Sequence, residues 1–138
     1  MNLIEKSLFL KKTKLLEKLD FDILLALSDK LEELKVDEGE HLFNAGDEAT
    51  GIYFIIEGSI ALQKTLSSTP ERSVEAFDFF GDESLFSEQK RGYFAIAETP
   101  VRLFILAKPY VFALLSECPP VAIELLSTYA SHIDLCAR

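Results

Sequence analysis

Short runs rich in β-branched and aromatic residues recur between residues 33 and 106, and this recurrence limits the fold more than any other feature. Residues typical of turns separate the runs, and no helix-length segment lies between the early ones. Parallel strands joined by helical crossovers are therefore excluded, and the pattern predicts an antiparallel sandwich or barrel. The runs are Glu33–Val36, His41–Phe43, Ile52–Ile56, Ile60–Thr65, Ser73–Phe77, Phe94–Ala97 and Val101–Leu106.

Helical patterns flank this region. Leucine and isoleucine recur at helical spacing over residues 3–10 and 24–31, and Asp20 or Asp22 is suited to cap the second helix. Near the other end, Pro109 fits a first helical turn. We therefore expect a single domain with N-terminal helices over 1–31, a β-barrel over 32–107 and C-terminal helices over 108–138, the last interrupted at Cys118-Pro119-Pro120.

Charge and composition exclude several classes of function. The net charge of −9 opposes binding to nucleic-acid phosphates, and the densest basic cluster, Lys11, Lys12 and Lys14, is small. Residues 1–10 lack the apolar run of a signal peptide, and no stretch is long and apolar enough for a membrane span. We expect a cytoplasmic protein that does not bind nucleic acid.

The residues needed for common kinds of catalysis are missing from the sequence. Its two histidines, His41 and His132, are too few for a metal site built from converging imidazoles. The two cysteines, Cys118 and Cys136, have neither metal-ligand nor disulfide-framework spacing, and no nucleophile elbow is present. We therefore expect no enzyme and no cofactor.

One loop, Phe80–Ala97, carries groups suited to holding a small phosphate. Gly81 permits a positive φ and a close approach of backbone to ligand. The residues after it are able to start a helical turn, whose N–H groups favour an anion. Arg91 supplies a planar cation that can grip two phosphate oxygens. Taken alone, a glycine, two acids and a later arginine are also typical of an ordinary surface turn.

The register of this loop resembles the phosphate-binding cassette of cyclic-nucleotide-binding domains. In that family, Phe-Gly-Glu-x-Ala-Leu precedes an arginine, small residues and a strand; here Phe80–Leu85 precedes Arg91 and Phe94–Ala97. Upstream, Gly46-Asp47 and the run Tyr53–Gly58 resemble the first half of the family pattern. The resemblance spans nearly the whole chain and implies a double-stranded β-helix, or jelly-roll, barrel with flanking helices.

The resemblance also implies the role of each site residue. Gly81 and Ser84 would present backbone amides to the cyclic phosphate, and Arg91 would neutralise its charge. Asp82 stands where the family has a glutamate that binds the ribose 2′-hydroxyl, with Glu83 beside it. Gly92 stands where a serine, threonine or alanine helps to hold the phosphate.

Three residues depart from the family pattern. Asp82 is shorter than glutamate, Gly92 has no hydroxyl, and Tyr93 replaces a small residue with a ring that could fill the nucleotide's place, stack on a base or point to solvent. The sequence therefore leaves two hypotheses open. One is a regulatory module that binds cAMP or cGMP; the other is a ligand-free interaction module that retains only the fold.

The expected output of a regulatory module is a conformational change passed to another protein or to a second copy of the chain. The segment Val121–Cys136 has a broad apolar face suited to this contact. On the same segment, Tyr129 and His132 are one turn apart and are either packing residues or lids over a purine. The expected partners are thus a cyclic nucleotide and, through the C-terminal helix, an unidentified protein or a homodimer.

Overall fold

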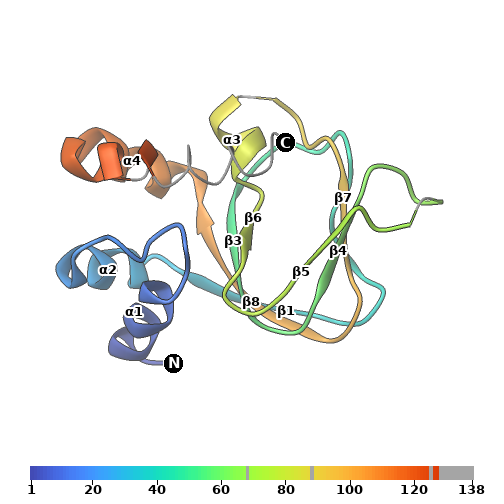
Figure 1. Cartoon of the computed structure of the whole chain (residues 1–138), viewed down its shortest axis with the longest axis horizontal. Helices are drawn as coiled ribbons and strands as arrows, with labels where there is room; N and C mark the ends of the chain where they lie inside the picture. Colours follow the sequence, from blue (N-terminus) through green and yellow to red (C-terminus); the bar gives the residue numbers. More distant parts are fainter. Residues whose placement is uncertain (68, 88, 125, 128–138) are drawn as a thin grey trace.

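Two antiparallel four-stranded sheets lie face to face, and helices cover the outer side of one of them (Figure 1). This computed structural model describes residues 1–67, 69–87, 89–124 and 126–127. The predicted mainly-β jelly roll with flanking helices is confirmed, as a pair of facing sheets. The segment 128–138, which holds Tyr129, His132 and Cys136, lies outside the described residues.

Each sheet combines strands that are distant in the sequence. The first has the order β1-β8-β3-β6, with β1 at Glu32–Val36, β8 at Val101–Ala107, β3 at Gly51–Glu57 and β6 at Phe79–Phe80. The second has the order β2-β7-β4-β5, with β2 at His41–Phe43, β7 at Phe94–Ala97, β4 at Ile60–Gln63 and β5 at Arg72–Val74. All the pairings are antiparallel, as predicted.

One predicted strand is shorter than the sequence indicates. The run expected to end at Phe77 ends at Val74, because Glu75 and Asp78 close a turn through an Asp78 N–H bond to the Glu75 carbonyl at 2.9 Å. Phe77 lies inside this turn with a φ of 71° and is 41% exposed. The strand predicted over Ser73–Phe77 therefore ends three residues early, whereas Phe79 and Phe80, after the turn, are buried.

The helices begin and end for identifiable reasons. In α1 (Leu3–Lys11), Asn2 and Glu5 form a reciprocal capping box. Asp20 precedes α2 (Phe21–Ser28) as predicted, although its side chain makes no capping bond. Pro109 lies in the first turn of α4 (Lys108–Glu117), which ends where the Cys118-Pro119-Pro120 break was predicted. The cassette contains a short helix, α3 (Asp82–Ser87).

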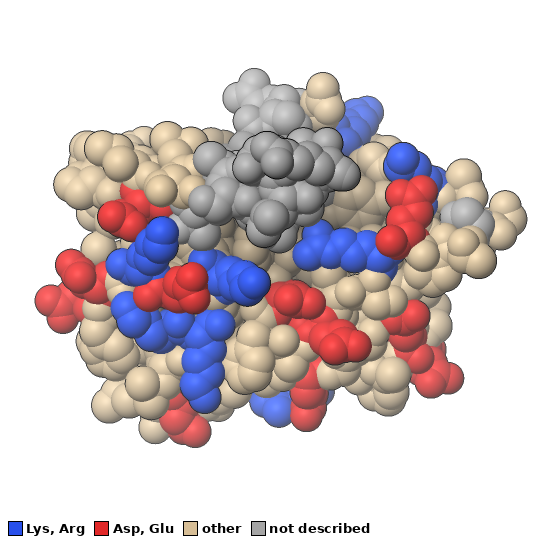
Figure 2. All heavy atoms as spheres, in the orientation of Figure 1, with Lys and Arg blue, Asp and Glu red and all other residues tan. Residues whose placement is uncertain are grey.

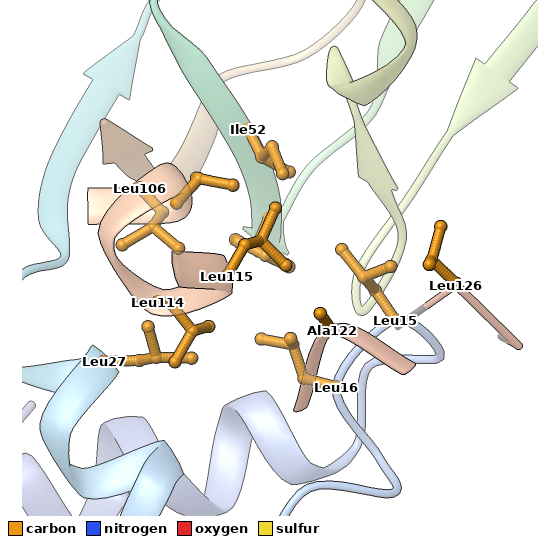
Figure 3. Close-up of a pocket in the computed structure, with 11 residues that line it drawn as sticks. Leu15, Leu16, Leu27, Ile52, Leu106, Leu114, Leu115, Ala122 and Leu126 are labelled. Carbon is orange, nitrogen blue, oxygen red and sulfur yellow. The ribbon is translucent and has the colours of Figure 1, made fainter. Parts of the chain in front are cut away.

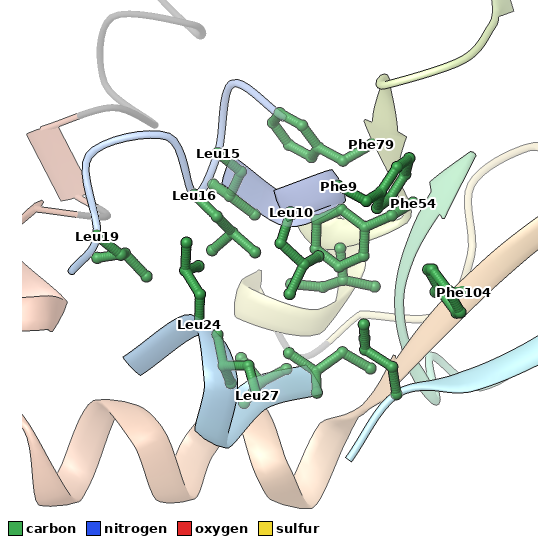
Figure 4. Close-up of a cluster of buried hydrophobic side chains, with 14 of the residues drawn as sticks. Phe9, Leu10, Leu15, Leu16, Leu19, Leu24, Leu27, Phe54, Phe79 and Phe104 are labelled. Carbon is green, nitrogen blue, oxygen red and sulfur yellow. The ribbon is translucent and has the colours of Figure 1, made fainter. Parts of the chain in front are cut away.

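Alternation along β3 builds two separate cores. Ile52 and Phe54 point toward the helices, whereas Tyr53 and Ile55 point between the two sheets, as the period of two in a strand requires. The helix-side core brings leucines of the N-terminal segment against Phe9, Phe54, Phe79 and Phe104 (Figure 4). Leu85 of α3 is fully buried in this same core, so the cassette is attached to the helical layer.

Arg102 on β8 links the three strands β1, β8 and β3 at the surface. Its guanidinium lies 3.2 Å from a Glu33 carboxylate oxygen and 3.3 Å from one of Glu57. The hydrogen bond from Arg102 lowers the pKa of Glu33 below its ordinary value. Glu33 therefore loses its proton more readily in the folded state than in the unfolded state. The contribution of the Arg102–Glu33 pair to the free energy of unfolding is fully present above the unfolded pKa of Glu33, near 4.3, and is lost as the pH falls through the lower, folded pKa.

We expect Glu33→Gln to lower the free energy of unfolding slightly at pH 7 and to have no effect once Glu33 is protonated in the wild type. The effect is small because both side chains are about one-third exposed and solvent screens the pair. Urea unfolding between pH 7 and pH 3 measures it. Glu32→Gln, at the exposed neighbouring position on β1, is the matched control; an equal pH dependence in the two variants would contradict the assignment.

Candidate functional site

The cassette runs from β6 through α3 and returns to β7 along residues 89–93. Gly81 joins β6 to α3 with a φ of 85°, a conformation that favours glycine. Space as well as φ restricts this position, because a Cβ on Gly81 would lie 3.0 Å from Arg91 Nη1 and 3.0 Å from Tyr53 Cδ2. Gly81 and Arg91, ten residues apart, are therefore in direct contact.

Arg91 is the centre of the site and is only 3% exposed. Its Nη1 donates to the Gly81 carbonyl at 2.5 Å, and its Nη2 donates to the Gly51 carbonyl at 3.0 Å. The buried Nε has no hydrogen-bond partner among the described residues. Two of the five N–H groups of the guanidinium thus donate to backbone carbonyls, whereas the buried Nε–H has no acceptor among the described residues.

The backbone of Arg91 is fixed by the turn after β2. The Arg91 N–H donates to the Asp47 carbonyl at 2.8 Å, and the Gly46 N–H donates to the Arg91 carbonyl at 2.7 Å. Gly46 has a φ of 93°, which glycine adopts readily. The Gly46-Asp47 pair therefore holds the cassette arginine in place as well as turning the chain.

Aromatic rings surround the Arg91 guanidinium. Its Cζ lies 4.3 Å from the centre of the Phe43 ring and 5.7 Å from that of Tyr53. The Tyr53 and Phe80 rings stack with centres 5.1 Å apart, which makes a continuous aromatic lining between the sheets. Cation–π contacts of this kind stabilise a charge that is taken out of water.

Sequence reasoning did not identify Phe43, Tyr53 or Gly51 as part of the site. Tyr53 was included in the family pattern only as a residue of a structural strand. The sequence signal for Tyr53 was its position on β3 between Ile52 and Phe54. Because side chains alternate along a strand, Tyr53 points to the face of the sheet on which Arg91 lies. Gly51 contributes a backbone carbonyl, which no residue type can indicate.

The structure brings most of the predicted site residues together. Asp82 and Ser84, in α3, are 6% and 5% exposed, and the Ser84 hydroxyl lies 3.4 Å from the Lys90 carbonyl. Glu83 is in the same helix, and its side chain lies outside the described part of the structure. Gly92 differs from the others, because it is exposed while Arg91 beside it is buried.

An open hollow of about 200 Å³ adjoins Gly92. Its lining includes Tyr93, the end of β4, Arg72 of β5, and Lys64 and Glu71 from the segment between these two strands. Tyr93 is half-buried, with its ring centre 5.4 Å from that of Phe43. The ring closest to Gly81 belongs to Tyr53. The site thus combines the buried Arg91 cation with an open hollow at the neighbouring residue, Gly92.

The described residues form neither a cluster of metal ligands nor a membrane-spanning helix. No group of three or more potential metal ligands forms among them, and none of their helices has the length and apolar character needed to cross a membrane. Cys118 is half-buried and unpaired by any disulfide. On the face seen in Figure 2, acidic and basic side chains are interspersed.

The chain belongs to the cyclic nucleotide-binding domain family. The family model matches residues 33–118, which include the cassette and, apart from Glu32 at the start of β1, all the strands of the described residues. The Global nitrogen regulator of Synechococcus elongatus is 31% identical over 102 residues, which cover 70% of this chain and 46% of that protein. The chain thus spans about half the length of this curated relative.

Solved structures share this fold. The N-terminal domain of a transcriptional regulator from Streptomyces coelicolor A3(2) has a TM-score of 0.77 and 25% identity, covering 93% of this chain and 94% of that one. The sensor domain of the regulator DNR from Pseudomonas aeruginosa has a TM-score of 0.81 and 19% identity, covering 98% and 93%. The regulatory domain of Toxoplasma gondii PKA, solved with cAMP, has a TM-score of 0.76 and 22% identity, covering 94% and 50%.

Proposed function

We propose that this domain is a regulatory module that binds a cyclic nucleoside monophosphate, cAMP or cGMP, at the Phe80–Ala97 cassette. The observation that carries the proposal is the buried Nε of Arg91, which has no partner among the described residues. A buried, unsatisfied donor of a permanent cation favours an anionic acceptor over water. A cyclic phosphate offers such an acceptor, and the cassette belongs to a family named for this ligand.

In this proposal, different residues of the site contact the phosphate, the ribose and the base of the nucleotide. Arg91 takes the phosphate while its backbone stays fixed to the Gly46-Asp47 turn. The Gly92 N–H, at the edge of the hollow, donates a second hydrogen bond to the phosphate, and the Asp82 carboxylate accepts a hydrogen bond from the ribose hydroxyl. The hollow along β4 and β5 leaves room for the base beside Tyr93.

We further propose that occupancy is transmitted through α3 to the helical layer. Leu85 of α3 is fully buried in the core that also holds Val111 of α4, so a ligand that moves α3 must repack this core. A packed core has few alternative arrangements, and a small shift at the loop therefore moves α4 between discrete positions. The receiving surface is on a partner protein or on a second copy of the chain.

A second function is favoured by a different observation. The aromatic rings of Phe43, Tyr53 and Phe80 fill space between the sheets next to Arg91, and Arg91 already has carbonyl partners. In this case the cation serves only to join the cassette to the sheet. The domain is then a ligand-free interaction module that keeps the fold of its family.

Calorimetry with cAMP and cGMP distinguishes the two functions. For the regulatory module we expect saturable, one-to-one binding of at least one of them in the micromolar range, because several charge-assisted hydrogen bonds of about 1.5–3 kcal/mol each are available. The linear nucleotide 5′-AMP is the control ligand, since it lacks the cyclic phosphate. No heat with either cyclic nucleotide at high micromolar protein would leave only the interaction module.

A further inference from the structure

A second cavity lies outside the two-sheet body, between the outer face of the first sheet and the helices. It measures about 230 Å³. Its described lining comes from the segment before α2, from α2, β3 and β8, and from α4 and the residues after it; among these are Leu16, Leu27, Ile52, Leu106, Leu115 and Ala122 (Figure 3). No residue of the Phe80–Ala97 cassette contributes to this described lining.

All the lining residues are apolar, and this determines the kind of molecule that can occupy the cavity. A buried water needs two to four polar partners, which leucine, isoleucine, valine, phenylalanine and alanine side chains cannot supply. A charged or strongly polar ligand would lose its hydration without compensation. An uncharged apolar molecule, in contrast, gains contacts that the facing leucines do not make with one another.

The size of the cavity narrows the ligand class further. An engineered apolar cavity of roughly 150 Å³ is large enough to bind benzene. The cavity here is larger, at about 230 Å³, which suits a two-ring aromatic or a medium-length hydrocarbon chain. Leu126, at its edge, is 67% exposed, so a ligand entering along this side meets an apolar surface first.

We propose that this cavity, named here the leucine cavity, is a binding site for an uncharged apolar small molecule. It is separate from the Arg91 site, because the first sheet lies between them, although Leu85 of the cassette packs in the same helix-side core. Ile52 and Phe54 line the leucine cavity, whereas Tyr53, on the opposite face of β3, contacts Arg91. This proposal does not depend on whether the cassette binds a nucleotide.

The neutral fluorescent dye N-phenyl-1-naphthylamine, which has an apolar two-ring group, tests the proposal on the full chain. We expect a saturable one-site rise in fluorescence, reversed by added naphthalene. Ala122→Phe places a ring in the cavity and should weaken dye binding at least about tenfold, since a filled apolar site offers no room. Ile123→Phe adds a ring at the adjacent position, which is 69% exposed and outside the lining, and should change binding less than about twofold.

A thermal unfolding curve for each variant confirms that it is folded, and Leu115→Phe is a second filling variant if Ala122→Phe is not. Weakening by the filling variant alone supports the leucine cavity as the site. Absence of saturable binding to the wild type overturns the proposal, because the cavity is then closed or filled by the chain itself. Equal binding by both variants and the wild type also overturns it, because the dye then binds elsewhere.

Discussion

Arg91→Met is expected to weaken cyclic-nucleotide binding by at least about a hundredfold while the domain remains folded. The variant removes the permanent positive charge and every donor of the guanidinium. Two charge-assisted bonds to a phosphate, at about 1.5–3 kcal/mol each, correspond to at least a hundredfold in affinity. Methionine keeps much of the side-chain length and makes favourable contacts with the rings of Phe43 and Tyr53.

Arg91→Met is also expected to lower the free energy of unfolding, by an amount that the contacts of Arg91 limit. It leaves the buried Gly81 and Gly51 carbonyls without their Arg91 donors. An unsatisfied buried acceptor costs about 1–3 kcal/mol, and the total stability of an ordinary domain is about 5–15 kcal/mol. We therefore expect a lower midpoint in urea but a cooperative transition, which must be checked before binding is measured.

Lys90→Met is the matched control for this experiment. It removes one positive charge from the neighbouring residue, whose side chain is 67% exposed and lies 4.0 Å from a Glu48 carboxylate. A surface pair of this kind contributes little, so both stability and nucleotide affinity should stay close to the wild-type values. Equal nucleotide affinity in Arg91→Met and Lys90→Met would show that the cassette arginine is not the phosphate ligand.

Much of the fold was predictable because strands and turns leave local signals. The run ending at Val36 was placed at its correct carboxyl end, and β2 and β7 were placed correctly at both ends. The exception is the region of β5 and β6, where one strand was predicted over Ser73–Phe77 and none at Phe79–Phe80. A positive φ at Phe77 breaks it, and β propensity carries no information about a turn stabilised by Asp78.

The site was predictable to a smaller extent, and the reason is physical. The register of Gly81 and Arg91 follows from spacing along one loop, which a sequence displays directly. The environment of Arg91 depends on contacts with Phe43 and Gly51, which lie at least forty residues away in the sequence. Only the packing of the two sheets brings them together, so the aromatic surroundings and the carbonyl partners of the guanidinium became visible only in the structure.

Gly81→Ala is expected to disrupt the cassette without replacing any charged residue. A φ of 85° costs a residue with a Cβ about 1–3 kcal/mol. The new methyl group would also lie 3.0 Å from Arg91 Nη1, so the guanidinium must move away from the Gly81 carbonyl that it bonds. We expect destabilisation of about 1–3 kcal/mol in urea and, since Arg91 is displaced, a loss of nucleotide affinity of about tenfold or more.

Gly92→Ala is the control that distinguishes displacement of Arg91 by Gly81→Ala from a general loss of loop flexibility. Gly92 has no heavy atom within 4 Å of an added Cβ and does not have a positive φ, so alanine fits without strain. Its N–H is retained, and the reduced freedom of the unfolded chain should leave stability unchanged or raise it by about 0.4–1 kcal/mol. If both alanine variants bind cyclic nucleotide as the wild type does, contact between Gly81 and Arg91 is not needed for the site. If Gly92→Ala loses affinity as strongly as Gly81→Ala does, flexibility of the loop, and not the position of Arg91, controls binding.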